Sequence, residues 1–168
     1  MFGARGRGRR GSAPKDSQQL QSLLLGTWQV RATNIPQWLS SERVAPAIAF
    51  ELISDAPLVL SDDVSWNSSG GQREHRLGVD RWNGRSFVRR GLGRRRLRRS
   101  LWSVVGSSAD RDILVLCLTG SRSVPPGLDV FVREGTEIGD ARSLVAHSAT
   151  ALGLTAEDFA SLTWLDRP

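Results

Sequence analysis

The 168-residue sequence predicts an all-β protein: an antiparallel β-barrel with helices from the C-terminal end packed outside it. Short runs of β-prone residues recur from Trp28 to Arg133, at a spacing of about 8–12 residues per strand. Turn signals made of Gly, Asn, Asp and Pro separate these runs. This regular spacing is typical of antiparallel sandwiches and barrels, and it disfavours alternating strand and helix units.

The length fits a single domain preceded by a tail. Residues 1–18 are rich in Gly, Arg, Ser and Pro and hold few apolar side chains, so burial cannot offset the entropy lost on ordering. We therefore expect a disordered basic tail at 1–18. The barrel domain is expected at 19–168, with a helical segment at 140–165.

The first strand is expected after a short amphipathic, leucine-rich segment. Trp28, Val30 and Ala32 alternate with polar or charged residues, which is the period of a half-buried strand. Residues 38–46 then form either a short serine-capped helix or a loop that closes one mouth of the barrel. The later strands are expected at residues 47–54, 57–66, 74–82, 86–90, 97–105, 113–119 and 128–133.

Helix signals replace the strand pattern near the C-terminus. Asp140 can cap a helix that runs to about Leu152, and Gly153 can end it. Thr155 and Asp158 have the spacing of a capping box that opens a second helix. The apolar stripes of this helical pair are expected to pack against the outside of the barrel.

The net charge of +6 is concentrated in two places, the tail and a run of seven arginines from Arg89 to Arg99. The rest of the chain is mildly acidic. This distribution differs from that of a uniformly basic nucleic-acid binder. No apolar run is long enough for a transmembrane helix or a secretory signal, so a cytoplasmic location is expected. Cys117, the one cysteine, excludes an internal disulfide and is expected to be a small buried apolar residue.

Four motifs resemble the small lipocalin-like proteins of the calycin superfamily in bacteria and fungi, which are mostly uncharacterised. They are Leu25-Gly26-Thr27-Trp28, Phe87 to Gly93, Ser100 to Gly106 and Pro125 to Arg133. The resemblance implies a barrel floor sealed by Trp28 and Arg133, because a guanidinium can lie flat on an indole face. Arg89 stands where that group usually has tryptophan, so the resemblance gives no support for ligand stacking there.

The sequence favours a non-catalytic protein without a metal or other cofactor. Neither His75 nor His147 has a second histidine at ligand spacing, and the usual nucleophile motifs are missing. A haem-binding barrel of the nitrobindin type stays open, although its longer glycine-rich signature does not follow Trp28. Asp62 and Asp63 face opposite sides of a strand and are interpreted as a solvated loop edge. An isomerase or hydrolase would require ionisable groups that converge in the barrel lumen.

Aromatic residues from separate predicted strands are the candidates for a ligand pocket. Indole and phenyl walls suit a flat or oily molecule. The alternative is ordinary core packing, because barrels of about eight strands either fill with side chains or hold one small ligand. The predicted pocket residues are Phe50, Trp66, Trp82, Phe87 and Trp102.

We therefore predict binding of a small hydrophobic or amphipathic, possibly anionic, molecule in a barrel pocket. The alternative is an anion-binding module that contacts nucleic acid or an acidic membrane through the tail and the 89–99 segment. The same arginines can instead form a solvated hairpin edge, or point inward and select carboxylates or phosphates. The candidate anion-binding residues are Arg94, Arg95, Arg96, Arg98 and Arg99.

Overall fold

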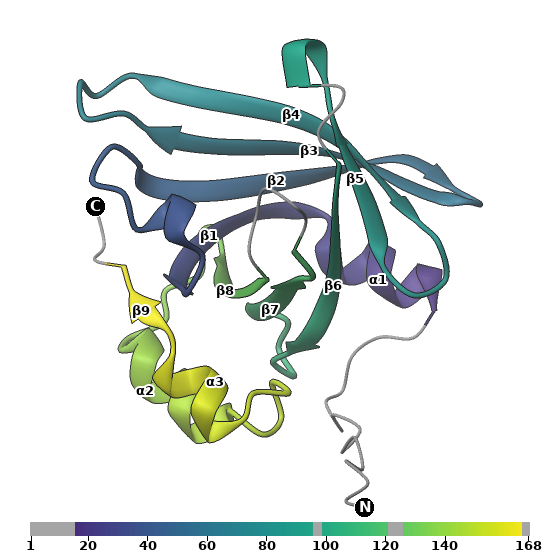
Figure 1. The fold of residues 1–168 in the computed structure, drawn as a ribbon. Helices are drawn as coiled ribbons and strands as arrows, with labels where there is room; N and C mark the ends of the chain where they lie inside the picture. The colour runs from purple at the N-terminus through teal and green to yellow at the C-terminus, as the bar shows by residue number, and fades with distance from the viewer. Residues whose placement is uncertain (1–15, 96–98, 121–125, 166–168) are drawn as a thin grey trace, which may run out of the picture.

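The computed structural model describes residues 16–95, 99–120 and 126–165. Within these residues, eight antiparallel strands follow one another from β2 to β8 and then β1, and β1 also pairs with β2, which closes the barrel (Figure 1). The predicted fold class is confirmed. The strands are β1 (Gly26–Thr33), β2 (Val44–Asp55), β3 (Leu58–Asn67), β4 (Arg73–Trp82), β5 (Phe87–Gly91), β6 (Arg99–Ser107), β7 (Ile113–Leu118) and β8 (Gly127–Arg133).

A short helix, α1 (Ser17–Leu24), precedes β1 and begins inside the range expected to be tail. Residues 1–15 lie outside the described residues. Ser17 and Gln18 are helical because Asp16 caps the helix, accepting a hydrogen bond from the Gln19 backbone N–H at 2.8 Å. Burial of three leucines on one face then holds the helix against the barrel.

The floor of the barrel is built where α1 meets the ends of β1 and β8. The Arg133 guanidinium lies 4.1 Å from the centre of the Trp28 ring. It also donates to the carbonyls of Leu23 and Leu25, each at 3.0 Å. The Leu23 carbonyl lies in the last turn of α1 and the Leu25 carbonyl at its C-cap, where backbone acceptors have no partner within the helix. The Arg133 side chain therefore seals the floor of the barrel and also caps the C-terminal end of α1.

The opposite end of the barrel carries the connection between β1 and β2, which holds a 3₁₀ turn, η1 (Pro36–Trp38). Residues 39–43 form a loop, and β2 begins at Val44. Of the two predictions for 38–46, the loop is therefore the better description. A second 3₁₀ turn, η2 (Gly93–Arg95), follows β5.

The C-terminal helices differ in length from the predicted pair. The helix α2 (Ala141–Ser148) ends four residues before Leu152, because residues 149–153 form turns closed by Gly153 at a φ of 74°. The helix α3 (Ala156–Ala160) has the predicted capping box. The predicted helical segment ran to 165, but β9 (Thr163–Trp164) is extended because it pairs with the end of β1.

The two larger of three apolar cores in the described residues lie on the two sides of the barrel wall. One fills the lower part of the barrel around Trp28, Phe50 and Phe87. The other lies between the outer faces of β1 and β6 to β8 and the C-terminal helices, which Figure 1 shows together on one side of the barrel. Gly106 permits this contact, since a Cβ there would lie 2.5 Å from the Leu152 carbonyl oxygen.

Candidate functional site

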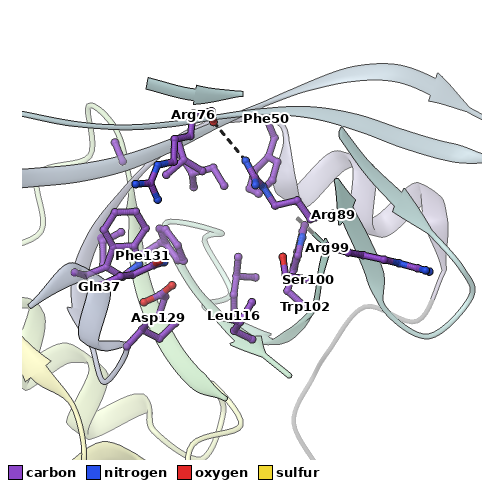
Figure 2. Close-up of a pocket in the computed structure, with 17 residues that line it drawn as sticks. Gln37, Phe50, Arg76, Arg89, Arg99, Ser100, Trp102, Leu116, Asp129 and Phe131 are labelled. Atoms are coloured by element: carbon purple, nitrogen blue, oxygen red, sulfur yellow. Dashed lines mark hydrogen bonds between the residues drawn. The ribbon is translucent and has the colours of Figure 1, made fainter. Parts of the chain in front are cut away.

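A cavity of about 180 Å³ lies inside the barrel, between its interior side chains and η1 (Figure 2). Apolar side chains from several strands form most of its wall. These include Val30, Phe50, Trp102, Leu116 and Phe131. They point inward because residues alternate between the two faces of each strand. Polar groups break this apolar lining on two sides, at Arg76 and Arg89 and at Asp129.

Two of the five predicted pocket aromatics line this cavity, Phe50 and Trp102. Phe87 and Trp82 are not among the side chains that line this cavity. Phe87 stacks on Trp102 with ring centres 4.3 Å apart, and Trp82 contacts Phe87 at 5.0 Å. The three rings are neighbours in strand register on β4, β5 and β6. They form a packed layer that supports the cavity wall instead of opening into it.

Trp66 is also absent from the cavity lining of the described chain. It packs edge-on against Trp38, with ring centres 6.3 Å apart. Two guanidiniums lie over its ring, that of Arg43 at 4.9 Å and that of Arg76 at 4.7 Å. The aromatic ring is therefore used to hold the connection after η1 and the Arg76 side chain at the rim of the barrel.

The solvated-edge interpretation of Asp62 and Asp63 is wrong for Asp62. The two do face opposite sides of β3, but Asp62 is buried inside the barrel, and Asp63 is the partner of His75 outside it. Arg89 donates to Asp62 from Nε at 2.9 Å and from Nη2 at 2.6 Å. Leu58, Leu60 and Asp62 occupy alternate inward positions, so the aspartate continues the buried face of the strand.

Asp80 completes this buried cluster, and the sequence reasoning missed it. It is fully buried, and its Oδ1 accepts a hydrogen bond from the Trp102 indole N–H at 2.6 Å. Burial, followed by the negative charge of Asp62, raises the pKa of Asp80 well above its ordinary value. Its Oδ2 has no donor among the described residues, which fits a protonated carboxyl that hydrogen-bonds to Asp62. Burial thus favours the neutral form of Asp80, and the carboxyl orients the Trp102 wall through this hydrogen bond.

Asp129 is a second ionisable group that the pocket prediction did not include. The Thr33 hydroxyl donates to its Oδ1 at 2.6 Å and itself accepts from the Ile35 backbone N–H at 2.9 Å. Burial raises the pKa of Asp129 to about 6, against the opposing effects of Thr33 and the nearby Trp38 indole N–H. That N–H lies outside hydrogen-bonding geometry with any described acceptor.

The arginines of the 89–99 segment are dispersed by the fold. Arg89 points into the barrel. Arg94 is exposed, and Arg95 ends η2. Arg99 lies at the cavity rim, but Figure 2 shows its guanidinium directed away from the cavity. Arg96 and Arg98 lie outside the described residues. The predicted anion-binding surface of the segment and tail stays a prediction.

The described residues also bear on metal binding and on membrane-spanning helices. No group of three or more His, Cys, Asp or Glu side chains in the described residues has the arrangement of a metal site. None of the described helices is long and apolar enough to cross a membrane. The ionisable groups that do converge are those of the barrel interior, Asp62, Asp80, Arg89, Arg76 and Asp129.

A closed eight-stranded antiparallel barrel with a helix across its floor and a cavity inside defines a lipocalin-like calycin fold, as the sequence motifs implied. Lobster apocrustacyanin A1 superposes with a TM-score of 0.60 at 10% identity, covering 94% of this chain and 89% of its own. The siderocalin Ex-FABP has a TM-score of 0.58 at 11% identity, with 87% and 95% covered. The cockroach allergen Per a 4 has a TM-score of 0.60 at 10% identity, with 88% and 87% covered. No protein-family model matches the sequence, and no curated protein sequence matches it significantly.

Proposed function

We propose that this protein binds a small amphipathic molecule inside the barrel without transforming it. The observation that carries the proposal is the cavity itself: an apolar enclosure within a closed barrel, with two arginines on one wall. A filled core would have left no such space. The fold is consistent with this use, since the siderocalin Ex-FABP, one of the structural neighbours, functions through dual ligand specificities.

The size of the cavity limits the ligand. Its volume is about 180 Å³, close to the roughly 150 Å³ of an engineered apolar cavity that binds benzene. The occupant is therefore a compact molecule of about ten non-hydrogen atoms, flat enough to lie against Phe50 and Trp102. The cavity alone does not hold a long chain or an extended polyene.

The wall formed by β4 and β5 sets the polarity of the ligand. Arg89 is held in place by Asp62, and Arg76 lies beside it, its backbone carbonyl accepting from Arg89 Nη2 at 3.4 Å. Burial raises the pKa of Asp80 well above its ordinary value, which leaves Asp62 as the carboxylate paired with Arg89. Guanidiniums in a desolvated site favour carboxylates and other strong acceptors. The ligand is thus expected to present an anionic or accepting group to this wall.

Native mass spectrometry of protein purified through high salt tests the proposal. We expect a discrete small-molecule adduct that is lost on denaturation. Leu116→Trp fills the cavity from β7 and should abolish the adduct, whereas Leu144→Trp, at an exposed position on α2, should retain it. Circular dichroism establishes that both variants fold. An adduct that persists in folded Leu116→Trp protein would place the ligand elsewhere and refute the proposal.

A further inference from the structure

The polar groups of the cavity lie on opposing walls. Four strand positions separate β4 from β8 in the closed barrel of eight, so the two strands face each other across the lumen. Arg76 comes from β4, Arg89 from the adjacent β5, and Asp129 from β8. All three line the cavity, and Figure 2 shows the two arginines on one side and the Asp129 carboxyl on the other.

The cationic wall retains a donor that no described residue uses. Asp62 occupies Nε and Nη2 of Arg89, and the Arg76 carbonyl shares Nη2. Nη1 of Arg89 has no hydrogen bond to any described residue, and the side chain is 22% exposed, toward the cavity. A guanidinium held in this way is already oriented for an acceptor on the ligand.

The acidic wall has the opposite character. Asp129 accepts one hydrogen bond from the described residues, through Oδ1, and forms no ion pair with any of them. A carboxylate in a half-buried position such as this one is stabilised by a cation or by several donors. The Trp38 indole N–H lies beside this carboxyl and lowers its pKa, but it carries no charge. The site therefore contains an acid that borders the cavity and has no countercharge among the described residues.

We infer that the cavity recognises a bifunctional ligand, with a carboxylate or similar acceptor at the Arg76 and Arg89 wall and a protonated amine at Asp129. The apolar body between the two groups lies against Phe50, Trp102 and Phe131. This inference rests on the proposed function and names the chemistry of its ligand. An amine supplies the charge that Asp129 lacks within the described chain, just as the acceptor end takes the unused donor of Arg89.

Five aromatic probes of matched size test it by isothermal titration calorimetry at pH 7. They are toluene, benzoate, benzylamine and the 3- and 4-isomers of (aminomethyl)benzoate, the two isomers covering different spacings between the walls. We expect at least one aminomethylbenzoate to bind roughly tenfold or more tightly than either benzoate or benzylamine. Asp129→Asn should remove the advantage of the amine and leave benzoate binding unchanged. Arg76→Gln should weaken the carboxylate probes and spare benzylamine.

The outcomes separate this inference from the proposed function. If toluene or benzoate binds but neither aminomethylbenzoate binds more tightly than benzoate, the bifunctional ligand is refuted and the cavity proposal stands. If none of the five probes binds, the cavity proposal fails as well. If Asp129 has only a structural role, Asp129→Asn should lower the unfolding temperature and leave the order of probe affinities unchanged. An unchanged order of affinities in this variant would also overturn the inference.

Discussion

The guanidinium of Arg89 lies directly over the α-carbon of Gly78. A Cβ at position 78 would be 2.6 Å from Arg89 Nη2, closer than a real side chain approaches. Gly78 stands opposite Asp62 in the register of β3 and β4, so the glycine provides the space in which the ion pair lies. Because the atoms in the way belong to a buried pair, they cannot move aside without losing their hydrogen bonds.

Gly78→Ala is therefore expected to destabilise the protein by about 2–4 kcal/mol, through overpacking and the disturbed ion pair. Urea unfolding followed by circular dichroism measures this. Gly139→Ala is the matched control, since a Cβ there meets nothing within 4 Å. Equal stabilities of the two variants would show that the ion pair shifts easily.

Removing one partner of the Arg89 and Asp62 pair should cost more than removing both. Asp62→Leu leaves a buried guanidinium, and Arg89→Leu leaves Asp62 beside Asp80; each is expected to cost about 3–5 kcal/mol. The double variant places two apolar residues in the same space and should recover most of that loss. A double-mutant cycle in urea gives the coupling energy. Additive effects of the two substitutions would argue that the pair is not coupled.

Asp80→Asn should be tolerated at neutral pH. Asparagine keeps a carbonyl oxygen for the Trp102 N–H and an N–H₂ donor for Asp62, so it resembles the neutral acid that burial favours. We expect a loss below about 1 kcal/mol, whereas Asp80→Leu leaves the indole N–H unpartnered and should cost about 1–3 kcal/mol. Thermal unfolding, with the near-ultraviolet signal of tryptophan as a second readout, distinguishes the two. A large loss in Asp80→Asn would indicate that Asp80 is ionised.

Asp129 should make stability fall as the pH rises. Its pKa is raised from 3.8 to about 6 on folding, so the protonated form favours the native state. That stabilisation is complete below pH 3.8 and is lost as the pH passes through 6, a change of at most about 3 kcal/mol. Asp129→Asn cannot ionise, so on acidification the unfolding free energy of the wild type should rise relative to that of the variant. Urea midpoints from pH 4 to 7.5 measure it, and parallel profiles would contradict the assignment.

The sequence was informative about the barrel because each strand carries its own signal. Alternation in Leu128 to Arg133 indicates a strand, and β8 forms there with Asp129, Phe131 and Arg133 on one face. The loop-rich connections were harder. The helix expected to end near Leu152 is shorter, and the chain at Thr163 pairs with β1, because tertiary contacts outweigh local propensity there.

The candidate site depended on information that a single strand does not carry. Asp62 and Arg89 are 27 residues apart, and they meet only through the register of β3 with β4 and of β4 with β5. The inward position of Asp62 could have been inferred from Leu58 and Leu60, but its partner could not. In the same way, Phe87 and Phe50 both point inward, and only their depth in the barrel decides that Phe50 reaches the cavity.

Because β1 pairs with both β2 and β8, the barrel cannot close until β8 has been synthesised. Arg133 holds the end of α1 from a position 108 residues after Leu25. A growing chain that has not yet reached β8 can form hairpins, but its sheet keeps two unpaired edges and its floor lacks the guanidinium that seals it. Chains that end before β8 are therefore the forms most exposed to aggregation.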